Sequence, residues 1–191
     1  PNYYAINCLW VAGSFKGKGH AKDLITSCIE EAKCMGKSGL VAISSAKKRP
    51  FLTDKPFFEK YGFEVVDTAP PYFELLVLHF QKGNQGKIPQ FLPQVKAAKC
   101  NETKGFAIYY SDQCPYTTFY AELLKEHILM KKGNCRLIHF QSREEARAGP
   151  SPFSTVSIYF NGHFLTHELL LPQKFDKLFE SLIKKIGSRT R

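Results

Sequence analysis

The sequence predicts an α/β protein with two successive domains, and three observations support this class. Residues 6–80 alternate between short apolar runs and longer segments whose apolar residues recur at steps of three and four. Residues 81–104 are polar and rich in glycine and proline, which is typical of a linker. A second alternation of strands and helices fills residues 105–191. We therefore expect one domain over residues 1–80 and another over 105–191.

The composition is that of a globular protein and excludes several other classes. The 191 residues, 43% of them hydrophobic, suffice for a sizeable core, and no apolar run is as long as a membrane span. The six cysteines lack the density of a secreted disulfide scaffold, so we expect a cytoplasmic protein without a membrane partner. Neither Cys-x-x-Cys nor His-Glu-x-x-His occurs, so no metal site is expected.

The first domain is predicted to begin with a strand, a helix and a second strand. Residues 6–11 form an apolar, β-branched and aromatic run of strand length. From Ala21 apolar residues recur at helical spacing, which predicts a helix ending near Gly36. Residues 40–44 are typical of a buried strand, and the helical connection makes it parallel to the first. The inward face of the helix is expected to consist of Leu24, Ile25, Cys28, Ile29, Ala32 and Met35.

A short helix and two further strands complete the predicted first domain. Pro56 suits the first turn of a helix that runs to Tyr61. Residues 64–67 resume as a strand, the prolines at 70 and 71 impose a turn, and residues 73–80 form a strong strand.

The second domain is predicted to contain four strands and three helices. The dipeptide Asn161-Gly162 is a strong hairpin signal between the last two strands. The strands are expected at 106–110, 136–140, 155–160 and 163–169, and the helices after Thr117, at 143–148 and at 172–186. The first of these helices is expected to turn Phe119, Tyr120, Leu123, Leu124 and Ile128 inward.

A basic, glycine-rich loop joins the first strand to the first helix and is the main candidate for a binding site. Gly17 and Gly19 allow the backbone to approach a ligand closely, and the start of a helix favours an anion, so phosphate is the natural guest. Lys22 stands where the dinucleotide fingerprint needs a third glycine, and the P-loop spacing is absent.

The net charge of +10 fits this interpretation better than it fits a nucleic acid partner. Lys16, Lys18 and Lys22 cluster at the loop, whereas the other basic residues are scattered over predicted helix faces. A small anionic ligand is therefore favoured, because a nucleic acid needs an extended basic surface.

The loop resembles the acetyl-CoA-binding motif of the GNAT N-acetyltransferase superfamily, Arg/Gln-x-x-Gly-x-Gly/Ala. A second motif of that family is matched by residues 57–63, Phe-Phe-Glu-Lys-Tyr-Gly-Phe. The resemblance implies that acetyl-CoA is the cofactor and that the first domain is the C-terminal half of a GNAT fold. It implies that the diphosphate is held by Lys16, Gly17, Lys18, Gly19, His20 and Ala21, and the pantetheine arm by Leu9, Trp10 and Val11. Residues 47–49, a basic run, are then either a solvated loop or a contact to the 3′-phosphate.

The catalytic residues implied by the resemblance are incomplete in this chain. The tyrosine that many GNAT members use to protonate the leaving thiolate is replaced by Phe58, which cannot donate a proton. Tyr61 is the neighbouring candidate, and a purely packing role for it stays open, as do water, a residue preceding Pro1 and simple release of thiolate. Family members place several strands ahead of this point, so part of the acceptor-amine site is expected outside the chain.

The second domain resembles a thioredoxin-like fold, and its position after a GNAT half resembles the YoaP-like domains of some bacterial acetyltransferases. The strand-to-helix corner that carries two cysteines in thioredoxins has only Cys114 here, with Thr117 in the second place. Ser154 stands where that fold has a cis-proline. Dithiol exchange is thus disfavoured, and Cys114 is either a reactive single thiol or a relic.

The histidines receive a simpler interpretation. His79, His139, His163 and His167 lie in predicted strands and are expected to be half-exposed. His20 differs because it lies in the glycine loop, where its backbone N–H is the expected contact.

The resemblances together predict an acetyl-CoA-dependent N-acetyltransferase that acts on a primary amine of a small molecule or peptide. Two alternatives stay open: a non-catalytic acyl-CoA-binding regulatory module, and a monothiol protein that uses Cys114. The sequence also leaves open whether the protein forms a homodimer.

Overall fold

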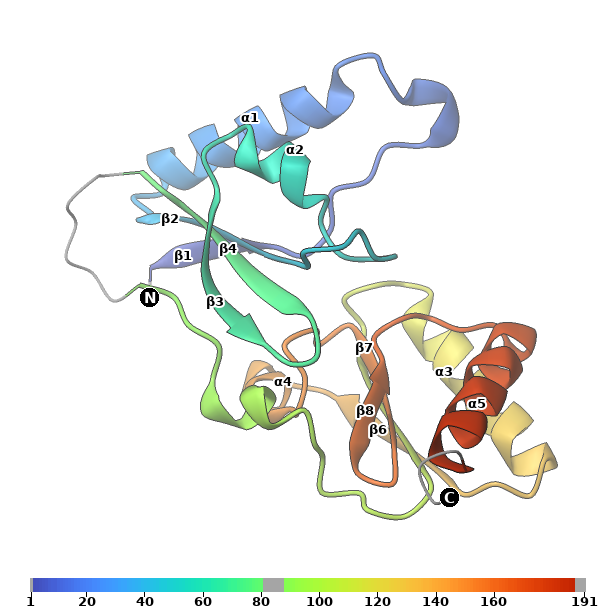
Figure 1. The fold of residues 1–191 in the computed structure, drawn as a ribbon. Helices are drawn as coiled ribbons and strands as arrows, with labels where there is room; N and C mark the ends of the chain where they lie inside the picture. Colours follow the sequence, from blue (N-terminus) through green and yellow to red (C-terminus); the bar gives the residue numbers. More distant parts are fainter. Residues whose placement is uncertain (1, 81–87, 188–191) are drawn as a thin grey trace. The chain divides into compact units, whose positions relative to one another are not determined.

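A computed structural model describes residues 2–80 and 88–187 of the chain (Figure 1). The chain divides into two compact units, Pro1–Ala97 and Ala98–Arg191. Residues 81–87, the start of the predicted linker, lie outside the described residues. The boundary between the units falls within the second half of that predicted linker.

The first unit is a four-stranded mixed sheet with two helices, in the predicted order of elements. The sheet order is β1-β2-β4-β3, with β1 and β2 parallel and the other neighbours antiparallel. The elements are β1 (Tyr3–Ile6), the 3-10 helix η1 (Gly13–Phe15), α1 (His20–Cys34), β2 (Gly39–Ser44), α2 (Lys55–Glu59), β3 (Glu64–Ala69), β4 (Phe73–His79) and η2 (Pro93–Ala97). The parallel pairing of the first two strands is confirmed.

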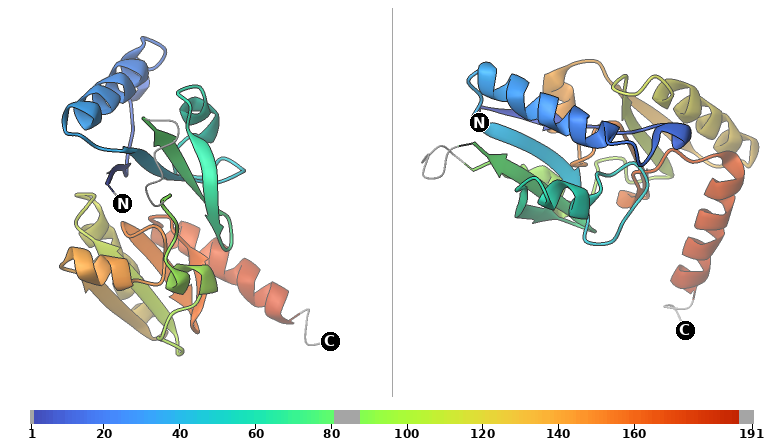
Figure 2. Two further views of the ribbon diagram at one scale, coloured as in Figure 1. Left: turned by 90° about the vertical axis from the view of Figure 1, so that its left-hand side faces the viewer. Right: turned by 90° about the horizontal axis from the view of Figure 1, so that it is seen from above.

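The core of the first unit lies between α1, α2 and one face of the sheet (Figure 2). Ile25 and Ala32, one two-turn step apart on α1, are fully buried there. Leu24 and Met35, predicted to face inward, are instead 48% and 60% exposed. The buried stripe of α1 is therefore narrower than the apolar pattern, because the helix contacts the sheet along one side only. Leu40, Ala42, Phe58, Phe63 and Leu76 complete the cluster.

The first strand differs from its prediction. It covers Tyr3–Ile6, and residues 7–12 are extended but unpaired. Composition favoured 6–11, yet a strand needs a partner, and the pairing with β2 ends where Ile6 lies opposite Ala42. Trp10, inside the predicted strand, is 73% exposed.

The end of the first unit is tied to β3 by Asp67. Its carboxylate accepts hydrogen bonds from the Phe91 N–H and the Lys96 ammonium, both at 2.8 Å. Burial alone would raise the pKa of Asp67, but these bonds, together with one from the Thr68 N–H, hold it below its ordinary value. Val95 is buried here, as expected of a segment that packs on a domain.

The second unit is also a four-stranded mixed sheet, with order β6-β5-β7-β8 and a parallel β5–β6 pair. In Figure 1, α3 and α5 lie on one side of this sheet and α4 lies on the other. The central strand β5 is buried on both faces. The elements are β5 (Phe106–Ser111), α3 (Thr117–Met130), β6 (Cys135–Phe140), α4 (Arg143–Ala148), β7 (Val156–Phe160), β8 (His163–Thr166) and α5 (Pro172–Gly187).

Two side chains of the second unit depart from prediction. Phe119, expected inward on α3, is 64% exposed, because the buried face of that helix runs through Thr117, Ala121, Leu124 and Ile128. The last strand ends at Thr166, so His167 is not a half-exposed strand residue. It is fully buried, and its ring meets Phe153 edge to face with centroids 5.3 Å apart.

Within the part of the chain that the structure describes, no helix has the length and apolar character to cross a membrane.

Candidate functional site

The glycine loop (residues 13–19) adopts a conformation that requires its glycines. Gly17 and Gly19 have φ values of 78° and 89°, in the left-handed region that other residues rarely adopt. A Cβ added at either position would meet nothing within 4 Å. Glycine is therefore needed for the backbone course, and the space in front of the loop is open to a ligand.

The start of α1 presents unpaired amides to this open space. Gly19 is the N-cap, and it gives no side-chain cap to the helix. Among the described residues, the N–H groups of Gly19, His20 and Ala21 have no hydrogen-bond acceptor, whereas the next two amides bond to the Gly19 carbonyl. Free amides at the positive end of a helix form an anion-binding site.

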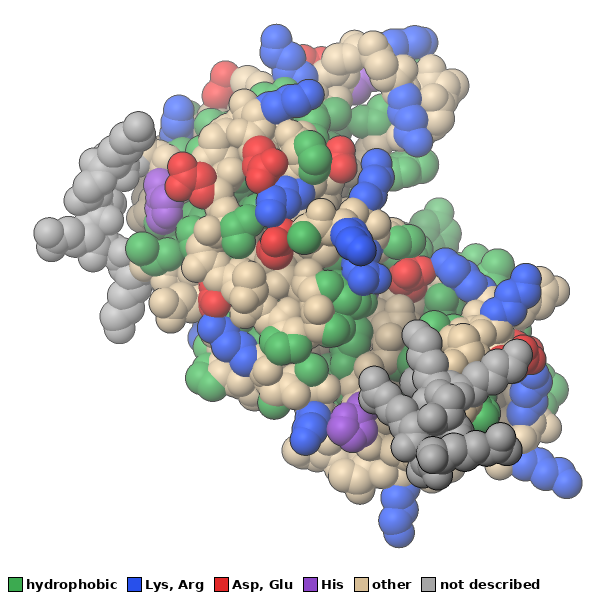
Figure 3. Space-filling view, in the orientation of Figure 1, with side chains coloured by type: hydrophobic (Ala, Val, Ile, Leu, Met, Phe, Trp, Pro, Cys, Tyr) green, Lys and Arg blue, Asp and Glu red, His purple; other side chains and the backbone are tan. Residues whose placement is uncertain are grey.

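Cationic and aromatic side chains surround these amides. The Lys18 ammonium lies 5.5 Å from the centroid of the Phe15 ring, and the Phe15 and His20 rings are 6.1 Å apart. Lys16 and Lys22 are also exposed. Figure 3 shows basic side chains gathered around this loop, at the upper right of the face drawn. The six residues predicted to hold the diphosphate, 16–21, are thus consecutive at the start of α1, and all except the half-buried Ala21 are exposed.

The stretch between β1 and the glycine loop is open along its backbone. Strand β2 continues to Ser44, two residues beyond its last pairing with β1. In the described structure, the peptide groups of residues 7–11 make no backbone hydrogen bond. Leu9, Trp10 and Val11 therefore lie outside a strand, but their N–H and C=O groups can pair with an extended ligand.

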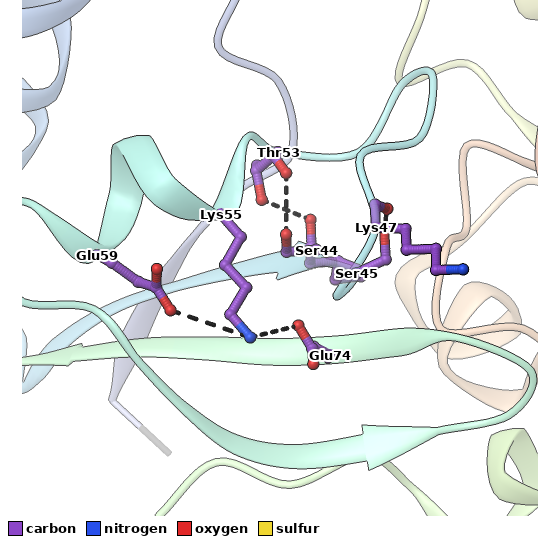
Figure 4. Close-up of polar contacts among 8 residues, drawn as sticks. Ser44, Ser45, Lys47, Thr53, Lys55, Glu59 and Glu74 are labelled. Atoms are coloured by element: carbon purple, nitrogen blue, oxygen red, sulfur yellow. Dashed lines mark hydrogen bonds and ion pairs between the residues drawn. The ribbon is translucent and has the colours of Figure 1, made fainter.

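A polar cluster that the sequence analysis missed lies where β2 ends (Figure 4). The Lys55 ammonium is 2.9 Å from Glu74 Oε2 and 3.9 Å from Glu59 Oε1. Beside it, the Ser44 hydroxyl donates to the Thr53 carbonyl, and the Thr53 hydroxyl donates to the Ile43 carbonyl. The signal in the sequence was Glu74, an acidic residue inside the otherwise apolar run 73–78.

The aromatic residues of the second motif belong to the core. Phe58 is 1% exposed and contacts Phe63 edge to face, with centroids 4.9 Å apart. Tyr61 is half-buried, and its ring centroid lies 5.1 Å from that of Phe57. The contacts of Tyr61 are thus those of a packing residue.

Cys114 lies in the second unit, in the turn between β5 and α3. It is a free, half-buried cysteine, and its carbonyl accepts a hydrogen bond from the Thr117 N–H. Thr117 is fully buried, and its hydroxyl has no partner among the described residues. In the same turn, Asp112 lies 2.8 Å from the His139 ring.

The described residues hold no group of three or more histidine, cysteine, aspartate or glutamate side chains that could bind a metal ion. An anion at the glycine loop would accordingly be held by amides and lysines.

Fold and site together define a mixed α/β protein whose first strand-to-helix loop is glycine-rich, basic and exposed. Residues 135–177 match the YoaP-like family. Over 182 residues, or 95% of this chain and 71% of the relative, the sequence is 42% identical to the protein named "Uncharacterized N-acetyltransferase YoaP" of Bacillus subtilis (strain 168). The chain belongs to this YoaP-like family. No solved structure matches it.

Proposed function

We propose that this protein is an N-acetyltransferase of the GNAT type that takes its acetyl group from acetyl-CoA and transfers it to a primary amine. The name of the Bacillus subtilis relative supports the reaction class. The observation that carries the proposal is the row of unpaired amides at Gly19, His20 and Ala21, which lies in open space beside lysine side chains.

These residues fit the diphosphate of coenzyme A. The three amides would donate hydrogen bonds to phosphate oxygens, and Lys16 and Lys18 would add positive charge. The backbone of residues 7–11, which makes no backbone hydrogen bond in the described structure, would pair with the amides of the pantetheine arm. Bound acetyl-CoA supplies an acetyl group activated as a thioester.

The chemistry left to the protein is to orient the acyl group, stabilise its oxygen and accept a neutral amine. An N–H near Val11 would donate a hydrogen bond to the acyl oxygen, and one such donor contributes about 3 kcal/mol to catalysis. Phe58 cannot protonate the thiolate, and the ring of Tyr61 packs against Phe57. Water, a residue that precedes Pro1 or simple release of the thiolate would then take the place of the missing tyrosine.

The second unit is proposed to be a thioredoxin-like domain without dithiol chemistry. Its order of elements, strand-helix-strand-helix-strand-strand-helix, and its mixed sheet support this. Cys114 takes the place of the first cysteine of the thioredoxin motif, and Thr117, a buried residue, takes the place of the second.

The test is a charge placed in the glycine loop. Gly19→Glu in the full-length protein combines backbone strain with repulsion of phosphate, so binding of CoA, followed by titration calorimetry, should be lost. Gly36→Glu is the matched control, since Gly36 ends the same helix with a φ of 63° and equally open space. Unchanged affinity in Gly19→Glu, or equal losses in both variants, would refute the site.

Catalysis is separated from mere cofactor binding by a second assay. The full-length protein, given acetyl-CoA and a panel of primary amines, should release free CoA thiol continuously. Binding of CoA without turnover on any amine would instead support the regulatory module.

A further inference from the structure

A groove in the first unit lies between the loop after β2 and the β3–β4 hairpin. Its volume is about 550 Å³, which suits one small molecule. Its walls are Ala46, Lys47, Arg49 and residues 68–74.

The guanidinium of Arg49 is fixed over the wall of this groove. Its central carbon lies 3.6 Å from the centroid of the Tyr72 ring, a stacking distance. Its Nε is shielded from solvent and has no hydrogen-bond partner among the described residues. Within the same residues Arg49 forms no ion pair, so its charge is held in place but not neutralised. A preorganised, unpaired guanidinium is well suited to bind an oxyanion.

The rest of the lining leaves the groove positive. Glu74 is the acidic residue of the lining, and Lys55 already pairs with it at 2.9 Å. Lys47 adds a second cation, and Figure 4 shows its side chain pointing away from the Lys55–Glu74 pair. An anion in the groove would therefore meet two cations that the described carboxylates do not neutralise.

The groove lies at the sheet edge where the proposed acetyl group is presented. Strands β1 and β2 are parallel, so the ends at Ile6 and Ser44 share one edge of the sheet. Ser44 lies opposite Glu74, which brings the start of β4 to the same edge. Residues 7–11 leave β1 at this edge. Ligands of open α/β sheets bind at the carboxyl ends of parallel strands.

We infer that this groove binds the anionic group of the acceptor, so that the substrate is a small amine that also carries a carboxylate or a phosphate. The inference rests on the proposed acetyl transfer. In Figure 1 the glycine loop and the β3–β4 turn lie at opposite ends of the first unit, which favours the acceptor over the 3′-phosphate of CoA as the occupant. Arg49 would hold two oxygens of the anion side by side, and Lys47 would add a single charge.

Substrate pairs test the inference in the full-length protein. With acetyl-CoA, each amino acid is compared with its α-amide, and O-phosphoethanolamine is compared with ethanolamine. In at least one pair, the anionic compound should have a kcat/KM at least about tenfold above that of its neutral partner. A preference for an amino acid over its amide identifies the group as a carboxylate, and a preference for O-phosphoethanolamine over ethanolamine identifies it as a phosphate. Equal kcat/KM within every pair would overturn the inference.

Variants of the basic run assign the effect to Arg49. Arg49→Gln should lower kcat/KM for the anionic member about tenfold, so that the preference over the neutral member is lost. Arg49→Lys, which keeps the charge without the planar fork, should retain part of the preference. Lys48→Gln is the matched control, since the Lys48 side chain is 83% exposed and does not line the groove. A full preference in Arg49→Gln would contradict the assignment.

Binding without turnover separates this inference from the proposed function. Titration with inorganic phosphate and with acetate, followed by NMR, should give saturable shifts in residues 68–74 and in the Arg49 Nε–H signal. The shifts should vanish in Arg49→Gln and persist in Lys48→Gln. Shifts confined to residues 16–21 would overturn the groove while the CoA site stands. The CoA site is tested separately, by calorimetry of CoA binding to the Gly19→Glu variant.

Discussion

The two strand-to-helix corners of the molecule are built in opposite ways. The first corner (residues 7–19) separates β1 from α1, and the second corner (residues 112–116) separates β5 from α3. The first is long, exposed and poor in backbone hydrogen bonds. The second is short and ends on Thr117, a fully buried residue.

The difference follows from what the backbone of each corner is bonded to. In the described structure the peptide groups of residues 7–11 make no backbone hydrogen bond, whereas the second corner follows a strand that lies between β6 and β7 and leads into the buried Thr117. Unpaired backbone groups can take a hydrogen-bonding partner. The first corner can therefore admit an extended ligand, while the second contributes to the core.

The largest expected effect on stability comes from placing a charge at the second corner. Thr117→Arg places an unpaired cation in the core and should destabilise the protein by about 4 kcal/mol. Urea unfolding measures the change. Thr117→Val is the matched control: it removes a hydroxyl without a partner among the described residues, and should change stability by less than about 1 kcal/mol. A well-tolerated arginine would show that the second corner is open.

Cysteine reactivity should report a related contrast, between the exposed first corner and the core of the second unit, with a difference of about 100-fold. Burial raises the pKa of the Cys135 thiol from 9.0 to about 11, so its thiolate is about 100-fold scarcer at neutral pH than that of an ordinary thiol. Cys8, at the first corner, and Cys34 are exposed. Iodoacetamide followed by mass spectrometry at pH 7 and pH 9 should modify Cys8 and Cys34 long before Cys135, with all rates rising with pH.

The same experiment decides the thiol alternative for Cys114. A rate at pH 7 no higher than that of Cys34 would end the monothiol interpretation, and early modification of Cys135 would contradict its enclosure.

A smaller effect is expected when the charge of the glycine loop is reversed. Lys16→Glu with Lys18→Glu should weaken CoA binding about tenfold at low salt and flatten its salt dependence, because exposed charges are screened. Stability should change by less than about 0.5 kcal/mol, since both side chains are exposed. Lys60→Glu with Lys177→Glu controls for net charge. An equal loss in both double variants would mean that the loop has no special role.

The order of elements in both units could be predicted because local signals were consistent with it. Pro56 at the start of α2 and the Asn161-Gly162 turn between β7 and β8 act within a few residues, and the structure confirms both. The glycine loop was equally readable, since positive φ at Gly17 and Gly19 is a property of the backbone alone.

What the sequence did not reveal depends on residues distant along the chain. The first strand ends at Ile6 because pairing with β2 ends there, which composition cannot show. The Lys55–Glu74 pair joins residues 19 apart, and Arg49 meets Tyr72 only because the hairpin folds beside the loop after β2. The basic run at residues 47–49 was visible, but its stacking partner was not.

The central claim, that amides at the start of α1 bind the diphosphate of CoA, is tested most directly by NMR. CoA is titrated into the full-length protein, and the amide signals of Gly19, His20 and Ala21 are followed. The account predicts that these three show the largest downfield shifts and saturate together with the calorimetric binding curve. Saturable CoA binding that leaves these three signals in place would contradict it.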